Sequence, residues 1–127
     1  MTPIKYFVTG GTGFIGSHLV DRLVEEGNRV TVFDNLSSGR KEFIEHHFGR
    51  DGFCLIQADL LDFETLKQSM QGHEVVWHLG ANTDIVGGNR ITDVDLKNCT
   101  IATWNVLEGM KRLGIDRLLF ASSATVY

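Results

Sequence analysis

The 127-residue chain is 43% apolar and has a formal net charge of -4 at neutral pH. This length and apolar content suit one domain with a hydrophobic core, so we expect a single domain over residues 1–127. The acidic balance and the scattered Lys and Arg residues argue against nucleic acid as a partner, because no basic patch is available to bind phosphates.

The cysteines and the N-terminal segment bear on the compartment. Cys54 and Cys99 form neither a disulfide framework nor a CxxC motif, which fits a reducing environment. The apolar run before Gly10 is too short for a signal-peptide core or a membrane span. We therefore expect a cytoplasmic protein without a membrane partner.

Segments rich in β-branched and aromatic residues alternate with helical patterns along the chain. Residues 4–9 predict a strand, 14–26 a helix, 29–33 and 53–57 two strands, 62–71 a helix capped by Asp62, 74–79 a strand, 92–113 a long apolar helix, and 117–121 a last strand. Gly27, Gly72 and Gly114 follow the three helices as stop signals.

This alternation predicts an α/β fold with a doubly wound parallel sheet, the Rossmann fold, with about five strands in the order 3-2-1-4-5. The nearly continuous apolar runs VTVF, VVWHL and LLF indicate strands that helices cover on both faces. A ligand is then expected at the carboxyl ends of the first and fourth strands, where the winding direction reverses.

The loop after the first strand reads TGGTGFIG. Gly11, Gly13 and Gly16 match GxGxxG, while Gly10, Gly13 and Gly16 match the variant TGxxGxxG. An early glycine allows the tight turn, the middle one leaves room for a pyrophosphate, and Gly16 lets the helix pack closely. The pyrophosphate would meet the free N–H groups and the positive dipole at the helix start.

An acidic residue completes the dinucleotide-binding pattern. Asp34 ends the next strand, at about the 20-residue spacing after the glycine loop that is typical of this motif. Its carboxylate would accept hydrogen bonds from the ribose hydroxyls and repel a 2′-phosphate, which favours NAD over NADP. Arg40 is a nearby positive charge that would weaken this preference.

The chain as a whole resembles the extended short-chain dehydrogenase/reductase family, the NAD-dependent epimerases and dehydratases, and within it the UDP-glucose 4-epimerase group. The matching stretches are TGGTGFIGSHLVDRL, DNLSSG, ADL, HLGA, TWNVLE and FASSATVY, in family order over essentially the whole chain. The resemblance implies NAD as cofactor, a UDP-sugar substrate and a homodimer. It also implies that this chain is the N-terminal part, ending after the fifth strand and before the YxxxK segment and substrate domain.

The resemblance also implies which residues bind the cofactor. Phe14 and Ile15 would contact the pyrophosphate, Asn35, Ser37 and Ser38 the adenosine ribose, Asp59 the adenine amine, and residues 79–81 the path to the nicotinamide ribose. From spacing alone, Asp59 could equally be a turn or cap residue. The complete set is Gly10, Gly13, Phe14, Ile15, Gly16, Asp34, Asn35, Ser37, Ser38, Asp59, Leu60, Leu79, Gly80, Ala81 and Cys99.

Two positions depart from the family pattern. Gly80 stands where alanine is common, which we expect to change little beyond local backbone freedom. Cys99 stands where an asparagine usually faces the cofactor, so we expect either a lower cofactor affinity or an alignment shifted by one residue. Asn98 cannot replace that asparagine without a register shift, because adjacent helix residues point about 100° apart.

The histidines predict no metal site. His46 and His47 are adjacent on a segment expected to be exposed, His78 lies in a buried strand, and no pair has HExxH spacing.

The stretch FASSATVY carries the expected catalytic residues. By resemblance, Ser123 would be catalytic by hydrogen-bonding the reacting sugar oxygen, and Thr125 would contact the substrate; without it, both would be read as turn residues. Tyr127 is interpreted as a packing residue, since no lysine follows it at YxxxK spacing. We expect the chain to bind NAD weakly without turnover.

The residues after Ser123 favour one reaction. Related 4,6-dehydratases carry an Asp-Glu pair there, whereas this chain has Ala124 and Thr125. The sequence therefore favours C4 epimerisation over dehydration. The alternatives are another dehydratase, decarboxylase or reductase of the family, a non-catalytic NAD-binding module, or a self-associating interaction fragment.

Overall fold

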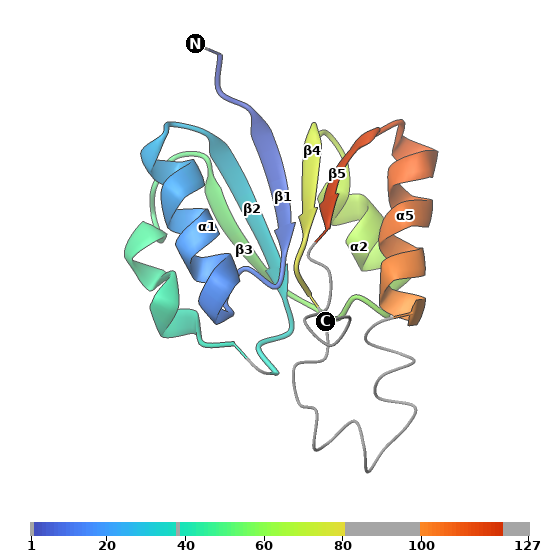
Figure 1. The fold of residues 1–127 in the computed structure, drawn as a ribbon, viewed down its shortest axis with the longest axis horizontal. Helices are drawn as coiled ribbons and strands as arrows, with labels where there is room; N and C mark the ends of the chain where they lie inside the picture. The colour runs from blue at the N-terminus through green and yellow to red at the C-terminus, as the bar shows by residue number, and fades with distance from the viewer. Residues whose placement is uncertain (1, 38, 81–99, 121–127) are drawn as a thin grey trace, which may run out of the picture.

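The computed structural model describes residues 2–37, 39–80 and 100–120, which form one sheet between helical layers (Figure 1). The elements in chain order are β1 (Lys5–Thr9), α1 (Phe14–Glu25), β2 (Arg29–Asp34), the 3₁₀ turns η1 (Lys41–Phe43) and η2 (Glu45–His47), β3 (Phe53–Gln57), α2 (Phe63–Met70), β4 (Val75–His78), α5 (Ala102–Leu113) and β5 (Arg117–Phe120). The expected strands and helices are present with ends shifted by a residue or two. The first part of the expected helix 92–113 lies outside the described residues.

The sheet has five strands in the order β3-β2-β1-β4-β5, and every neighbouring pair is parallel. The predicted order 3-2-1-4-5 is therefore confirmed. Thr9 is in register with Phe33 of β2 and with His78 of β4. The carboxyl ends of the three central strands thus meet at one edge of the sheet.

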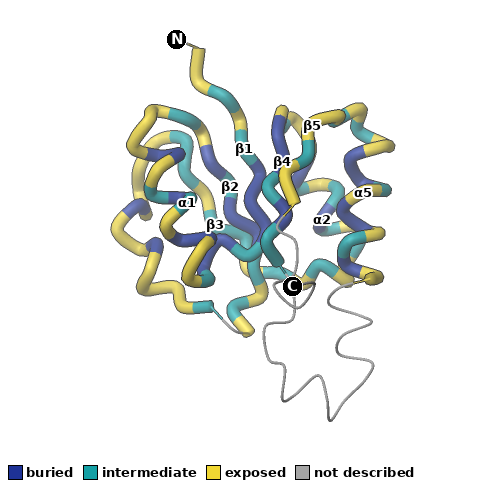
Figure 2. Tube along the Cα trace, viewed as in Figure 1, coloured by how far each residue is buried: buried dark blue, intermediate teal, exposed yellow. Residues whose placement is uncertain are grey.

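Two hydrophobic clusters lie on opposite faces of the sheet. Successive strand residues point to opposite faces, so Phe7 and Val8 of β1 belong to different clusters. One cluster packs beneath α2 and α5 and contains Phe7, Phe33, Leu66, Met70, Val76, Val106 and Met110. The other packs beneath α1 and the segment after β2 and contains Val8, Val20, Leu23, Val24, Val30, Val32 and Ile44. Figure 2 shows these buried positions concentrated between the layers.

Local signals explain the helix ends. The Asp62 side chain accepts hydrogen bonds from the Thr65 N–H (3.3 Å) and hydroxyl (2.6 Å), which confirms Asp62 as the N-cap of α2. Gly114 ends α5 in the left-handed conformation, with φ of 74°. Among the described residues, no helix is long and apolar enough to cross a membrane.

The last strand differs from the expectation. The run LLF predicts coverage on both faces, but β5 is the outermost strand of the sheet that the described residues form, and Leu119 and Phe120 are 44% and 57% exposed. The prediction is wrong here because apolar content reports the preference of a strand for burial, not its place in the sheet.

Candidate dinucleotide-binding site

The glycine loop joins β1 to α1 at the carboxyl edge of the sheet. Gly10 has φ of +74°, and its N–H donates to the Phe33 carbonyl at 3.1 Å. A Cβ atom on Gly10 would lie 2.7 Å from the Gly80 nitrogen, closer than side-chain atoms approach backbone. The loops after β1 and β4 therefore contact each other directly, and only glycine fits at this point.

The other two motif glycines have different surroundings. A Cβ on Gly16 would overlap the Gly10 carbonyl oxygen, so α1 packs against the loop with no room for a side chain. A Cβ on Gly13 would meet only the Gly10 oxygen, at 3.5 Å, among the described residues. Within the described part of the chain, Gly13 therefore borders open space. This is what the sequence predicts for the glycine that faces a pyrophosphate.

The start of α1 offers unpaired donors to that space. Gly13 is the N-cap and supplies no side-chain cap, and the first turn, all of it described, contains no acidic residue. The first N–H groups of a helix lack intrahelical acceptors, and here those of Phe14 and Ile15 are among them. Both side chains are exposed, at 75% and 69%. The helix dipole is thus uncompensated, as an anion site requires.

Asp34 faces the glycine loop from the end of β2. Its Oδ2 atom accepts hydrogen bonds from the Thr12 N–H (3.1 Å) and from the Thr12 hydroxyl (2.5 Å). Its Oδ1 atom accepts from the Leu36 N–H at 2.8 Å, and Leu36 adopts an unusual positive φ of 62°. An ionised carboxylate has about four acceptor positions, so these three bonds fix its orientation and leave capacity for a ligand hydroxyl.

The segment after β2 lies against the same loop. The Arg40 N–H donates to the Thr12 carbonyl at 3.0 Å, and a Cβ on Gly39 would overlap the Thr12 hydroxyl oxygen. Asn35 and Ser37 are exposed nearby, and Asn35 Oδ1 accepts from the Ser37 N–H at 3.0 Å. Their predicted contacts with a ribose stay predictions.

The loop after β3 is held by α5. Asn105 is buried, and its Nδ2 atom donates to the Leu60 carbonyl at 2.8 Å. Asp59 is exposed and its Oδ1 atom accepts from the Leu61 N–H at 2.9 Å, which is the turn role that the sequence left open. Its contact with adenine stays a prediction.

Thr9 organises the junction between β1 and β4. Its hydroxyl oxygen accepts from the N–H groups of Leu79 (3.1 Å) and Gly80 (3.0 Å). It lies 2.7 Å from His78 Nδ1, to which it therefore donates its only proton. His78 Nε2 then carries the ring proton and donates to the Thr103 hydroxyl at 2.9 Å. Burial lowers the pKa of His78 to about 4.

Gly80 is more constrained than expected. A Cβ there would lie 2.9 Å from a terminal methyl carbon of Leu60 and 3.2 Å from the Thr9 hydroxyl. The expectation that alanine would alter only backbone freedom is therefore incomplete, because Leu60 would have to move and the Thr9 hydroxyl would be crowded.

Several predicted site residues lie outside the described residues. They are Ser38, Ala81, Asn98, Cys99, Ser123, Ala124, Thr125 and Tyr127. Their predicted roles stay predictions.

The histidine expectation is partly wrong. His46 is exposed, but His47 is 2% exposed and packs against Phe53. The Nε2 atoms of both rings lie within hydrogen-bond distance of Asp21 Oδ1, at 2.9 and 2.6 Å. No sequence pattern indicated this cluster, because Asp21 is distant along the chain and belongs to α1.

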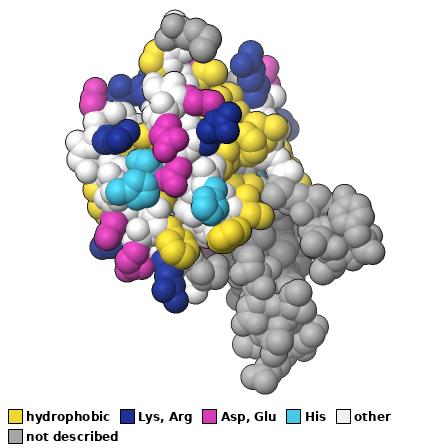
Figure 3. Space-filling view, turned by 60° about the vertical axis from the view of Figure 1, so that its left-hand side comes forward, with side chains coloured by type: hydrophobic (Ala, Val, Ile, Leu, Met, Phe, Trp, Pro, Cys, Tyr) yellow, Lys and Arg dark blue, Asp and Glu magenta, His cyan; other side chains and the backbone are white. Residues whose placement is uncertain are grey.

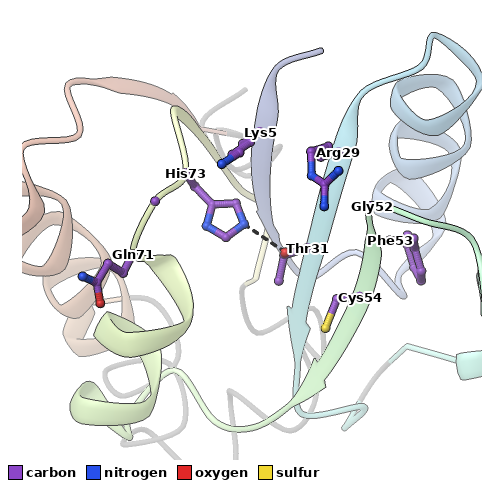
Figure 4. A pocket seen from close by; sticks show the side chains of 9 residues that line it. Lys5, Arg29, Thr31, Gly52, Phe53, Cys54, Gln71 and His73 are labelled. Carbon is purple, nitrogen blue, oxygen red and sulfur yellow. Dashed lines mark hydrogen bonds between the residues drawn. The ribbon is translucent and has the colours of Figure 1, made fainter.

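A pocket of about 320 Å³ lies at the opposite, amino-terminal edge of the sheet (Figure 4). Lys5, Arg29 and His73 are among the residues that line it. His73 Nδ1 donates to the Met70 carbonyl (3.0 Å), so Nε2 accepts from the Thr31 hydroxyl (2.9 Å), and burial lowers the His73 pKa. The pocket shares no residue with the glycine loop and is not the dinucleotide site.

Sequence reasoning assigned no structural role to four polar side chains that hold the site together. They are Thr9, Thr12, Thr103 and Asn105. Thr9 and Thr12 flank the loop glycines, and Thr103 and Asn105 belong to the stretch TWNVLE, so their positions beside recognised motifs were the available signal.

A parallel sheet of this order, a glycine loop opening α1 and an acidic residue ending β2 together define a Rossmann dinucleotide-binding domain. The model of the NAD dependent epimerase/dehydratase family matches residues 6–127. The chain belongs to this family, whose members depend on NAD.

The relatives of the chain differ from one another in activity. The chain is 37% identical over 123 residues to UDP-glucuronic acid decarboxylase 1 of Danio rerio, a match covering 97% of this chain and 28% of the relative. It is 37% identical over 119 residues to a putative UDP-glucose 4-epimerase of Methanocaldococcus jannaschii, covering 91% and 37%.

Solved structures also match this chain over only part of their own length. A UDP-N-acetylglucosamine 4-epimerase from Methanobrevibacter ruminantium matches with a TM-score of 0.90 and 34% identity, covering 100% of this chain and 40% of that one. A Thermus thermophilus UDP-glucose 4-epimerase, solved as a complex with NAD, matches with a TM-score of 0.84 and 30% identity, covering 94% and 38%. The chain thus spans between about a quarter and two fifths of the length of these relatives.

Proposed function

We propose that this chain is the NAD-binding part of a nucleotide-sugar epimerase, of the kind that interconverts UDP-glucose and UDP-galactose. The observation that carries the proposal is the position of Asp34, whose carboxylate is held against the glycine loop by Thr12 beside the open start of α1. When bound, NAD supplies a hydride acceptor for sugar C4 and returns the hydride to the opposite face of the 4-keto sugar.

Different residues would bind the pyrophosphate and the adenosine of the dinucleotide. The pyrophosphate would occupy the space beside Gly13, at the start of α1, where the N–H groups of Phe14 and Ile15 have no acceptor within the helix. The adenosine ribose would bind Asp34, whose negative charge disfavours a 2′-phosphate. Asn35, Ser37 and Ser38 would border the ribose, and Asp59 and Leu60 the adenine.

The nicotinamide end would lie along residues 79–81. The Thr9 hydroxyl accepts hydrogen bonds from the backbone N–H groups of Leu79 and Gly80 and donates one to His78, so these contacts hold the backbone of residues 79 and 80 in place. Both His78 nitrogens are hydrogen-bonded, and its pKa near 4 keeps it neutral at neutral pH. His78 therefore holds in place the residues that border the crevice, and it is not a proton donor or acceptor for the substrate.

The reaction assignment depends on the C-terminal stretch. Ser123 is proposed as the catalytic residue that hydrogen-bonds the sugar oxygen, with Thr125 contacting the substrate. The Ala124-Thr125 pair offers no acid and base for dehydration, which supports epimerisation. No YxxxK pattern occurs in the 127 residues, so we expect this chain alone to bind NAD without turnover.

Decarboxylation of a UDP-glucuronate is the second candidate. It is favoured by the identity with UDP-glucuronic acid decarboxylase 1, which equals that with the putative 4-epimerase. Both reactions begin with the same C4 oxidation, so the cofactor half does not separate them.

We also propose that the complete enzyme is a homodimer in the cytoplasm. Trp104 and Leu107 of α5 are 58% and 46% exposed, and such apolar side chains on a helix surface favour association.

Two measurements test the proposal. Calorimetric titration should show that the chain binds NAD. The Asp34→Ala variant should bind NAD about tenfold or more weakly, and its preference for NAD over NADP should be smaller than that of the unchanged chain. Asp51→Ala, an exposed aspartate in the turn before β3, is the matched control. Equal NAD affinity in the chain and in Asp34→Ala would refute the site.

The complete enzyme should convert UDP-glucose to UDP-galactose. Release of CO₂ from UDP-glucuronate instead would assign the second candidate. Turnover of either sugar by the 127-residue chain alone would contradict the assigned division of the active site.

A further inference from the structure

Three side chains that the cofactor site does not use converge on one face of the molecule. Asp21 comes from α1, and His46 and His47 come from η2. Each residue offers one ligand atom, a carboxylate oxygen of Asp21 and one imidazole nitrogen of each histidine. These three atoms all lie within 4.8 Å of one another. Figure 3 shows this side of the molecule, where histidine and acidic side chains lie next to each other.

The convergence of the two rings is unusual for neighbours in a 3₁₀ turn. Consecutive residues of such a turn point about 120° apart, so their side chains normally diverge. Here the ring centroids of His46 and His47 are 4.0 Å apart, and both Nε2 atoms lie within 2.9 Å of the same Asp21 oxygen. Both rings therefore present a donor atom to one point.

His47 has no other polar partner among the described residues. Its side chain is 3% exposed, and its Nδ1 atom is buried without a hydrogen bond. Buried polar atoms are rarely unpaired, so the position of this ring depends on what its Nε2 atom binds.

The cluster is open to solvent on its other side. The side chains of His46 and Asp21 are 56% and 34% exposed, so an ion could enter and keep a water ligand.

We propose that Asp21, His46 and His47 form a binding site for a divalent transition ion of the zinc class. Two imidazole nitrogens and one carboxylate oxygen are ligands that Zn²⁺ takes, whereas Mg²⁺ and Ca²⁺ prefer oxygen ligands alone. With metal–ligand bonds of about 2.0–2.1 Å in a tetrahedral site, ligand atoms are about 3.3 Å apart. Each N–O separation then widens by roughly half an ångström, which the exposed side chains of Asp21 and His46 allow.

The ion would join two parts of the chain that border the cofactor site. Asp21 lies on the helix that opens with the glycine loop, and η2 belongs to the segment that contacts Thr12 through Arg40. The site is therefore structural, and occupation should raise the thermal stability of the chain.

The test is calorimetric titration of Zn²⁺ into the metal-stripped 127-residue chain without a polyhistidine tag. We expect one Zn²⁺ per chain, and His46→Ala or Asp21→Asn should each weaken the affinity by about tenfold or more. Both changes are at solvent-accessible side chains, so the variants should fold, which circular dichroism checks. His18→Ala, an exposed histidine on α1, and Cys54→Ser, an exposed thiol, should bind as the unchanged chain does.

A second measurement needs no variant. Co²⁺ added to the unchanged chain should give the visible absorption of a tetrahedral site with nitrogen and oxygen ligands, without a thiolate charge-transfer band. The proposal is overturned if the chain binds no Zn²⁺, or if affinity is unchanged in both His46→Ala and Asp21→Asn. Loss of the ion in Cys54→Ser would assign it to the thiol and also overturn the proposal.

Discussion

The Thr9 hydroxyl lies 2.7 Å from His78 Nδ1, between the two strands at which the winding of the sheet reverses. The same oxygen accepts the N–H groups of Leu79 and Gly80, so one side chain closes three hydrogen bonds at the carboxyl edge. Because the loops after β1 and β4 both border the expected ligand crevice, the shape of this crevice depends on Thr9.

Thr9→Val should destabilise the chain and weaken NAD binding together. Valine keeps the shape but leaves His78 Nδ1 and the Gly80 N–H without their partner, whereas the Leu79 N–H keeps its hydrogen bond to the Thr9 carbonyl. The free energy of unfolding should therefore fall by about 2–3 kcal/mol. Urea unfolding and NAD titration measure the two effects.

Thr31→Val is the matched control for this change. Thr31 also hydrogen-bonds a histidine, His73, but near the opposite edge of the sheet. It should cost about 1 kcal/mol and leave NAD affinity unchanged. Equal NAD affinities in the two variants would show that Thr9 does not shape the crevice.

The chain should lose stability in mild acid through His78. Its pKa falls from 6.5 to about 4 on burial, so below pH 6.5 the unfolded chain binds a proton that the folded chain does not. Stability attributable to His78 is therefore complete above pH 6.5 and declines toward pH 4, by up to about 3 kcal/mol in all.

Urea unfolding at several pH values checks this prediction, with His78→Asn as the reference that lacks the titrating ring. Above pH 7, the free energy of unfolding should depend on pH equally in the unchanged chain and in His78→Asn. Long-range ¹H–¹⁵N spectra should show the Nε2–H tautomer of His78, and an Nδ1–H tautomer would contradict the assigned direction of the Thr9 hydrogen bond.

The architecture follows from the sequence because it depends on local patterns. Alternating strands and helices with short links permit few parallel topologies, and the glycine loop marks the switch point. Gly13 and Gly16 have the surroundings that the motif predicts, one open and one tightly packed. Asp62 likewise caps α2 through a contact three residues away.

The remaining features depend on contacts between distant segments. The burial of His47 requires Asp21 and Phe53 to come together, and the alternation of residues along the chain does not encode that. The exposure of β5 depends on its place as the outermost strand among the described residues. Thr9 is a common strand residue whose role appears only when β4 is placed beside it.

Gly13→Ala and Gly16→Ala should separate binding from folding. A methyl group at position 13 would point into the open space beside α1, so the variant should fold normally but bind NAD at least about tenfold more weakly. A methyl group at position 16 would collide with the Gly10 carbonyl, so the free energy of unfolding should fall by about 2 kcal/mol or more. Thermal unfolding and NAD titration of both variants measure this; a strongly destabilised Gly13→Ala would refute the division of roles.

Gly39→Ala should weaken NAD binding although position 39 is outside the glycine loop. The added Cβ would overlap the Thr12 hydroxyl oxygen and lie 2.7 Å from the Thr12 carbonyl carbon, so the backbone must separate there. Thr12 holds Asp34 through two hydrogen bonds, and the shift should therefore reorient the carboxylate that selects NAD. Gly109→Ala is the matched control, because its Cβ would make an ordinary contact with Met70 at 3.6 Å and favour the helix. NAD titration should show a loss only in Gly39→Ala, and unchanged affinity there would mean that the segment after β2 does not set the position of Asp34.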